Sequence, residues 1–267
     1  MKISAAIIAA TLALCPLAAQ SPAPSATQGA AQRAGQGATE LLASIDSRRE
    51  IPDMSFELRI TSFEAGRQKD FNVLWGFVKT SAADNKVLVS FEEPASVKGR
   101  KMLMDGNIVY YLFPRTRNPI RLSPLQVLLG ETSNGDVART GFSKDYDVRE
   151  LSEADREGTP CYLFALDAKE SKKDATYRSV KLWVEKASLR PQYAEFFAAD
   201  GKLLKRAFYK DYREAEGRDL PFLLDIYDGD DPQKHTTMAY TKIGRKPVPD
   251  TVFRRDYLEA WTPEPPR

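Results

Sequence analysis

The sequence predicts an α+β protein in which a large antiparallel sheet carries a few helices against one face. Apolar and polar residues alternate with period two through most of the chain, and these runs follow one another through short turns. Apolar residues at helical spacing occur in only a few places. Hydrophobic residues make up 42% and charged residues 28% of the 267 residues, which is typical of a globular chain rather than a disordered one.

Composition also restricts the classes of function. With 39 Lys+Arg against 37 Asp+Glu, the formal net charge is +2, which argues against a nucleic-acid-binding protein with a concentrated basic face. His235 is the only histidine, and Cys15 and Cys161 are the only cysteines. A Cys/His zinc site is therefore nearly excluded, and a serine hydrolase would have only His235 as its base. We expect a protein with neither enzymatic activity nor a cofactor.

The N-terminal residues indicate export. Residues 1–19 combine a positive Lys2, an apolar run too short to span a bilayer and a plausible cleavage site, which is typical of a secretory signal peptide. Lipid attachment at Cys15 is an alternative, although the residue before it is not small. Residues 20–37 are rich in Ala, Gly, Gln, Ser and Pro and predict a flexible linker. The mature chain then keeps Cys161, which we expect to be a small buried residue.

The first half of the mature chain predicts one helix followed by strands. Ala38, Leu41, Leu42 and Ile45 recur at helical spacing before Pro52, which indicates an amphipathic helix. Period-two alternation then predicts strands over residues 56–60, 71–77, 87–91, 102–104 and 108–113, the last two joined by a turn at Asp105-Gly106.

A second, shorter helix is expected after these strands. Ser123 would cap it, Pro124 would occupy its first turn and Gly130 would end it. The predicted strands of the second half span residues 162–166, 177–184, 193–197, 203–209, 223–227 and 236–243, with a hairpin turn at Asp200-Gly201. We therefore expect one domain over residues 38–258, and a Pro-rich tail over 259–267 that frays.

Several polar segments are candidates for a catalytic or ligand-binding site. Ser133 lies between two glycines, but the spacing is wrong by one for a nucleophile elbow. Residues 228–231 (DGDD) lack the order of calcium ligands in an EF-hand, so a polar turn is favoured. Arg115, Arg117 and Arg121 form a local basic group after an aromatic strand. Contact with a phosphate or an anionic head group and a solvated loop both remain open for these arginines.

The apolar side chains permit two interpretations. Aromatic residues make up 10% of the chain and lie in predicted strands together with methionine, leucine and valine. These side chains form either a packed core or, if the helices are too few to fill the inner face of the sheet, the lining of an apolar cavity that binds lipid.

Several motifs resemble those of the LolA-like outer-membrane lipoprotein-sorting proteins. Residues 91–94 (FEEP) and 98–103 (KGRKML) resemble the family's F-x-x-P and K-G-x-x-x-L pattern, and residues 107–117 (NIVYYLFPRTR) resemble its W-x-Y-x-P-x-x-R strand and turn. Residues 133–139 and 181–184 resemble a more specific signature of one proteobacterial branch, as do Asp145-Tyr146, Pro191 and residues 201–205. Together these segments cover residues 38–253 in order and spacing.

The resemblance implies a fold and a function. The implied fold is a curved antiparallel sheet, an unclosed half-barrel, covered by helices that form a lid over an apolar cavity. The implied function is a periplasmic carrier that takes acyl chains of a lipid or lipoprotein from an inner-membrane transporter of the ABC or RND type towards an outer-membrane acceptor. Tyr110 stands where many relatives have Trp, and the chain is longer than the minimal lipoprotein carrier, so the resemblance extends only to the broad LolA-like group.

Two functions are compatible with this resemblance. The first is the carrier, expected to be a monomer. The second is a periplasmic module that senses lipid or lipoprotein and regulates a membrane signalling partner. In either case the expected ligand-binding side chains are large apolar residues on predicted strands, and the arginines named above would contact the head group. The expected lining residues are Trp75, Met102, Met104, Tyr111, Phe113, Trp183 and Phe196.

Overall fold

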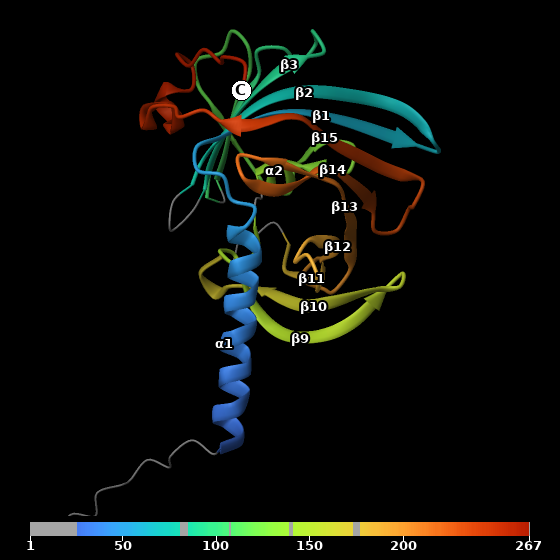
Figure 1. Cartoon of the computed structure of the whole chain (residues 1–267). Helices are drawn as coiled ribbons and strands as arrows, with labels where there is room; N and C mark the ends of the chain where they lie inside the picture. The colour runs from blue at the N-terminus through green and yellow to red at the C-terminus, as the bar shows by residue number, and fades with distance from the viewer. Residues whose placement is uncertain (1–25, 81–84, 107, 139–140, 173–176, 267) are drawn as a thin grey trace, which may run out of the picture.

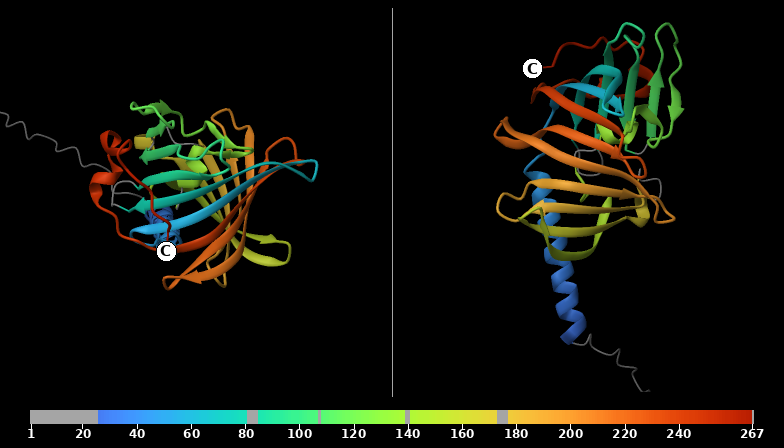
Figure 2. Two further views of the ribbon diagram at one scale, coloured as in Figure 1. Left: turned by 90° about the horizontal axis from the view of Figure 1, so that it is seen from above. Right: turned by 90° about the vertical axis from the view of Figure 1, so that its right-hand side faces the viewer.

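The computed structural model describes residues 26–80, 85–106, 108–138, 141–172 and 177–266. Thirteen strands form one antiparallel sheet, in the order β6-β5-β4-β3-β2-β1-β15-β14-β13-β12-β11-β10-β9. The sheet curves strongly, and its edge strands β6 and β9 do not pair with each other (Figures 1 and 2). The predicted α+β class and the unclosed half-barrel are therefore confirmed. The predicted signal peptide and Cys15 lie outside the described residues.

The strands of the sheet have the following bounds: β1 Met54–Glu64, β2 Arg67–Lys79, β3 Lys86–Glu93, β4 Lys101–Asp105, β5 Ile108–Leu112, β6 Ile120–Leu122, β9 Tyr146–Arg156, β10 Thr159–Ala168, β11 Ser179–Glu185, β12 Pro191–Phe197, β13 Leu203–Ala215, β14 Arg218–Asp228 and β15 Lys234–Arg245. Two short strands, β7 (Val127–Leu129) and β8 (Thr132–Ser133), pair separately. The helices are α1 (Ala26–Ser47), α2 (Asn134–Ala138) and three 3-10 turns, η1 (Glu170–Lys172), η2 (Asp250–Phe253) and η3 (Arg255–Tyr257).

The first and last strands of the chain meet in the middle of the sheet. β1 pairs with β15 along its whole length, from Met54 opposite Arg245 to Glu64 opposite Lys234. From this central pair the chain proceeds outward by hairpins, through β2 to β6 on one side and from β14 to β9 on the other. The chain between β6 and β9 must therefore connect the two outer edges, which brings it across the open side of the half-barrel.

The hydrophobic core lies on the inner face of the sheet. Phe56, Leu58 and Ile60 of β1 are at most 1% exposed and belong to this core, whereas the residues between them face outward. Leu42 and Ile45 of α1 pack into the same cluster. The helix starts at Ala26, within the segment that was expected to be a linker, and its C-terminal half supplies the predicted apolar stripe. Burial of that stripe explains why the C-terminal half of α1 lies against the half-barrel (Figure 1).

A second cluster covers the outer face of strands β2 to β5. Phe77, Leu88, Leu103 and Leu112 point away from the main core and pack against Val252, Phe253, Leu258 and Trp261. The Lys101 ammonium group donates to the backbone carbonyls of Leu258 and Glu259, at 3.1 and 2.9 Å, and to that of Trp261. Trp261 is only 6% exposed. This part of the Pro-rich tail therefore packs against the sheet, contrary to the expectation that the tail frays.

Two local predictions differ from the structure. Residues 123–126 form a turn, in which Gln126 N donates to Ser123 O at 3.1 Å, and β7 follows in place of the predicted helix. Pro124 suits the second position of a turn as well as the first turn of a helix. Strand β9 was not predicted, because a bulge opposite Ala165 and Leu166 breaks its alternation and places Val148 and Leu151 on the same face.

Candidate functional site

The inner face of the sheet is closed by the segment that connects its two edges. We call residues 123–138 and 141–145 the lid; they contain β7, β8 and α2. Val137 and Phe142 of the lid belong to the same buried cluster as Leu42 and Ile45 of α1 and the inner residues of the sheet. In Figure 1, α2 lies inside the curve of the sheet. The lid and α1 therefore form a second layer over the half-barrel.

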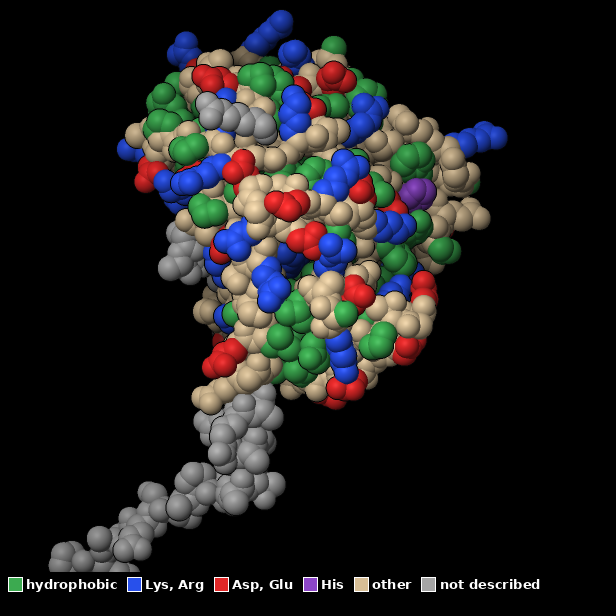
Figure 3. All heavy atoms as spheres, in the orientation of Figure 1, with side chains coloured by type: hydrophobic (Ala, Val, Ile, Leu, Met, Phe, Trp, Pro, Cys, Tyr) green, Lys and Arg blue, Asp and Glu red, His purple; other side chains and the backbone are tan. Residues whose placement is uncertain are grey.

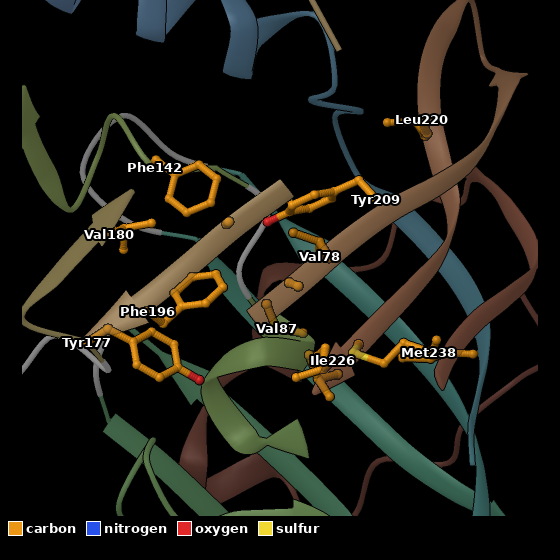
Figure 4. Packing of buried hydrophobic residues seen from close by; sticks show 14 of the residues in the cluster. Val78, Val87, Phe142, Tyr177, Val180, Phe196, Tyr209, Leu220, Ile226 and Met238 are labelled. Atoms are coloured by element: carbon orange, nitrogen blue, oxygen red, sulfur yellow. The ribbon is translucent and has the colours of Figure 1, made fainter. Parts of the chain in front are cut away.

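A small cavity remains between this layer and the sheet. Its volume is about 50 Å³. In Figure 4 the rings of Phe142, Phe196 and Tyr177 lie together, and Ile226 and Met238 lie across from them. The lining residues come from the turn after α1, the lid and strands β12 to β15: Arg49, Asp136, Gly141, Phe142, Phe196, Lys205, Ala207, Tyr209, Leu224, Ile226 and Met238.

The size of this cavity shows whether the interior is open or closed to a bound acyl chain. Pockets for small molecules are typically about 300 to 1,000 Å³. At about 50 Å³, this cavity holds a water molecule or two but cannot hold an acyl chain. The structure is therefore a closed form at this site, and a chain of methylene groups could enter only if the lid or the lining side chains moved.

A polar network fastens α2 to the sheet. Lys205 of β13 points into the interior, and its ammonium group lies 2.7 Å from Asp136 Oδ2. Asp136 Oδ1 accepts a hydrogen bond from the Tyr177 hydroxyl at 2.6 Å. Asp136 Oδ2 also accepts from the backbone N–H and the hydroxyl of Ser133, at 2.8 and 2.9 Å. The side chains of Asp136 and Lys205 are only 10% and 14% exposed, so the ion pair is largely shielded from water.

The pKa of Asp136 predicts how the network responds to acid. Burial opposes ionisation of the carboxyl group, but Lys205 and the hydrogen bonds from Tyr177 and Ser133 outweigh burial and lower its pKa. A carboxyl group with a lowered pKa stabilises the fold above its unfolded value of about 4, and this contribution is lost as the pH falls through the lower folded value. We expect the free energy of unfolding, measured by urea titration, to decrease as the pH is lowered below about 4. Asp136→Asn should reduce that slope, and an unchanged slope would contradict this assignment.

A second contact fastens the other end of the lid to α1. Asp46 Oδ2 accepts from the backbone N–H groups of Phe142 and Ser143, both at 2.7 Å, and Asp46 Oδ1 lies 2.8 Å from Arg49 Nη2. A Cβ at Gly141 would lie 2.8 Å from the Asp46 carboxyl carbon, so only glycine permits this close approach. The lid is therefore held at α2 by the Lys205 network and near residue 142 by Asp46.

Three of the predicted lining residues belong to the buried inner cluster. Met102, Tyr111 and Phe196 are 0%, 6% and 6% exposed and lie in the core under the lid and α1. Met104 packs against the same cluster but is only partly buried. Phe113 is 41% exposed at the rim of the sheet, where its ring lies 5.0 Å from that of Tyr111.

Trp75 and Trp183 are wrongly placed in the predicted lining, because both lie on the outer face. Trp75 pairs with Glu57 across the sheet, and its indole N–H donates to Glu57 Oε2 at 3.1 Å. Trp183 alternates with the core residues Leu182 and Val184, so its ring points outward. The apolar residues of a curved sheet with two covered regions do not all face one side, and amino-acid type alone could not separate the faces.

The sequence prediction missed the residues that line the cavity beside Phe196. Ile226 and Met238 lie in strands that were predicted, so alternation along those strands was a usable signal for them. Asp136 lies in the segment 133–139 that carries the family resemblance, but nothing local shows that it meets Lys205 of β13. The interior position of Lys205 follows from its pairing with Phe196 on β12, which long-range strand register decides.

His235 belongs to a row of contacting aromatic rings on the outer face. Its imidazole lies 4.7 Å from the Phe63 ring and 5.0 Å from the Tyr227 ring, with interplanar angles of 4° and 21°. The row continues through Phe208, Tyr193 and Trp183, each ring within 5.5 Å of the next. Figure 3 shows the histidine at the molecular surface. Stacking between two strand neighbours gives His235 a structural role in the sheet.

The predicted basic group lies at an exposed edge of the half-barrel. Arg115, Arg117 and Arg121 are exposed, next to or within the edge strand β6. The chain contains 39 Lys+Arg and 37 Asp+Glu, and residues 94–130 contain six of the basic residues but only one of the acidic residues. The rest of the chain is therefore net negative. Of the large apolar side chains exposed in this stretch, Phe113 (41%) and Ile120 (47%) lie at this edge, whereas Leu125 (52%) and Val127 (64%) are exposed on the lid.

The remaining motifs form ordinary turns. Asp228 Oδ1 accepts from the N–H groups of Asp230 and Asp231, both at 2.8 Å, which is the polar turn predicted for this segment. Across the described residues, no group of three or more His, Cys, Asp or Glu side chains is arranged to hold a metal ion. Cys161 is fully buried, as predicted. Within the same residues, no helix has the length and apolar character needed to cross a membrane.

Comparison with known proteins places this architecture among solved folds. A family model described as that of an uncharacterized protein matches residues 83–260, which is more than half of the chain. The structure is similar to that of a LolA superfamily protein from Nitrosomonas europaea, with 28% identity and a TM-score of 0.74, covering 82% of this chain and 98% of the other. No curated protein matches the sequence.

Two more distant structures share the fold. A DUF1329 family protein from Desulfovibrio piger has 18% identity and a TM-score of 0.71, over 82% of this chain and 97% of the other. An outer membrane lipoprotein-sorting protein domain from Vibrio parahaemolyticus has 17% identity and a TM-score of 0.71, over 83% and 97%. At these identities the similarity concerns the arrangement of the half-barrel.

Proposed function

Because this chain belongs to the LolA-like family of outer-membrane lipoprotein-sorting proteins, we propose that it binds acyl chains of a lipid or lipoprotein between the sheet and the lid. The observation that supports this most strongly is the inner face itself, which is apolar and is covered by a lid held through a few polar contacts. In the proposed cycle the lid opens and the acyl chain replaces contacts that the lid made with the inner face. The acyl chain is released when the lid closes again.

The free energies make such a cycle reasonable. Keeping each methylene group from water is worth about 0.8 kcal/mol, so an acyl chain crossing an aqueous compartment needs an apolar cover. A lid held by the Asp136–Lys205 pair and the Asp46 contacts can open locally, whereas a core built from one continuous layer would have to unfold. None of these steps requires a covalent change, and we propose that the protein is not an enzyme.

Lipid extracted from the purified protein tests the proposal. The mature chain, isolated from its native compartment without detergent, should carry lipid that organic extraction and mass spectrometry detect at a stoichiometry near one per protein. The stripped protein should then bind a fluorescent fatty acid. Protein that carries no lipid and does not bind the fluorescent fatty acid would contradict the proposal.

The carrier role and the compartment are part of the same proposal. The predicted signal peptide supports a periplasmic location, and family membership supports transfer from an inner-membrane transporter towards the outer membrane. The alternative is a lipid-sensing module that regulates a signalling partner. Crosslinking in cells separates the two: a carrier is recovered with a transporter, and a sensor is recovered with a regulatory membrane protein.

We further propose that the exposed edge at β6 contacts the membrane surface during loading or release. Arg115, Arg117 and Arg121 would face anionic head groups, and the apolar side chains of Phe113 and Ile120 would enter the interface. The excess of positive charge over residues 94–130, in a chain that is otherwise net negative, supports an anionic lipid surface as the occupant of this edge.

Vesicle flotation measures this contact. The mature chain should bind vesicles that contain phosphatidylglycerol, and binding should weaken by about fivefold for each arginine removed in Arg115→Ser and Arg117→Ser. Ile120→Ser should weaken binding as well, because it removes an exposed apolar side chain of β6. The matched control is Arg67→Ser with Arg213→Ser, which removes equal charge from exposed positions on β2 and β13. Equal effects of the two arginine pairs would contradict a specific edge.

A further inference from the structure

A pocket rich in arginine lies at the end of α1, close to the interior cavity. It has a volume of about 190 Å³. Arg48 and Arg49 come from the turn that follows α1, Arg190 comes from the loop before β12, and Arg218 comes from the start of β14. Tyr212 of β13 completes this side of the pocket. Four arginines from three separate parts of the sequence thus line one pocket.

The acidic groups nearby do not balance these charges. Asp219 also lines the pocket, and it accepts from Arg190 Nε and Nη2 at 2.5 and 3.1 Å. Asp46 lies 2.8 Å from Arg49 and also holds the lid. Among the described residues, neither Arg48 nor Arg218 forms an ion pair with a carboxylate. Glu185 accepts from the pocket-lining Ser188 at 2.6 Å and also acts on Arg190. Three carboxylates thus face four arginines, and an excess of positive charge remains.

Arg49 connects this pocket to the apolar interior. It lines both the 190 Å³ pocket and the 50 Å³ cavity beside Phe196 and Met238. Its side chain is only 9% exposed. Its Nε is buried and has no hydrogen-bond partner among the described residues. A buried donor without a partner is costly, and an anionic oxygen at this place would satisfy it.

We propose that this pocket binds the anionic head group, a phosphate or a carboxylate, of the lipid whose acyl chain enters the interior. The inference rests on the proposed function, because it assigns a head-group site to the same ligand. Guanidinium groups bind phosphates and carboxylates through paired hydrogen bonds, and Arg49 lies where a head group in the pocket would adjoin a chain in the cavity. The ligand is then an anionic amphiphile rather than a neutral one.

Displacement of a neutral fluorescent acyl probe from the mature chain tests this assignment. The competitors are palmitate, which offers a carboxylate, lysophosphatidylglycerol, which offers a phosphate, and the uncharged monopalmitoylglycerol. At least one anionic competitor should bind about tenfold more tightly than the uncharged one, and the tighter of the two identifies the head group. Arg48→Ser with Arg218→Ser should remove most of this preference while leaving the affinity of monopalmitoylglycerol unchanged.

Two further variants make the result specific. Arg49→Met keeps the apolar stem, removes the unpartnered Nε donor and should also reduce the preference for anions. Arg67→Ser with Arg254→Ser removes equal charge from exposed positions on β2 and after η2, and should leave the preference intact. Equal affinities of charged and uncharged competitors in the unaltered protein, or a preference that survives both pocket variants, would overturn the pocket while the carrier function stands. Failure of the probe itself to bind would overturn both.

Discussion

Replacing Lys205 with Met should lower the free energy of unfolding by about 3–5 kcal/mol, because it leaves the Asp136 carboxylate buried without its cationic partner. The remaining hydrogen bonds from Tyr177 and Ser133 do not neutralise that charge. Urea unfolding followed by tryptophan fluorescence measures the change. Since the network also fastens α2, the same substitution should speed the entry of a fluorescent acyl probe.

The neighbouring Lys210 provides a matched control. It lies on the same strand and pairs with Asp225 at 2.8 Å, but its side chain is 49% exposed on the outer face. Lys210→Met should therefore cost no more than about 1 kcal/mol. Combining Lys205→Met with Asp136→Asn should cost less than Lys205→Met alone, because the uncompensated charge is removed. Equal costs for the two lysine variants would contradict the role assigned to the buried network.

Phe196→Ala should cost a similar amount, about 3–5 kcal/mol, because it removes a ring at the centre of the inner cluster. Phe196 lies 4.7 Å from the Tyr177 ring and 6.4 Å from the Phe142 ring of the lid. The substitution also enlarges the 50 Å³ cavity that Phe196 lines. If acyl chains occupy this space, a fatty acid should raise the melting temperature of Phe196→Ala more than that of the unaltered protein.

The adjacent Phe197 serves as the control for this experiment. It occupies the next position on β12 and faces outward, so Phe197→Ala should cost less and should show no added response to fatty acid. A fatty acid that stabilises Phe197→Ala and Phe196→Ala equally would place the ligand elsewhere. A fatty acid that stabilises neither the variants nor the unaltered protein would contradict an interior binding site.

The sequence was sufficient to predict the sheet, because most strands alternate cleanly and two Asp-Gly pairs mark turns. It could not separate the two faces of that sheet. Trp75 and Trp183 are large aromatic residues on predicted strands, like Tyr111 and Phe196, yet they face outward. The C-terminal segment around Trp261 covers part of the outer face, and apolar residues there form a second buried cluster. Local alternation cannot show which of the two clusters a given apolar residue joins.

The polar contacts of the lid could not be predicted from short stretches of sequence, because they join residues that are far apart in the chain. Asp136 and Lys205 are 69 residues apart, and Asp46 and Phe142 are 96 apart. Such pairs depend on which strands are neighbours and on the path of the chain from β6 to β9. The arginine pocket likewise joins the end of α1 to the β13–β14 hairpin. The predicted basic group at Arg115 was visible because its members are close in sequence.

The central claim is that acyl chains occupy the interior between the sheet and the lid, and photocrosslinking tests it most directly. A fatty acid with a diazirine near the end of its chain is bound to the mature protein, irradiated and mapped by peptide mass spectrometry. We predict crosslinks to residues that line the cavity, above all Phe196, Ile226 and Met238, and loss of these crosslinks when unlabelled fatty acid competes. Crosslinks confined to the outer face, for example at Trp183 or Phe208, would contradict the claim.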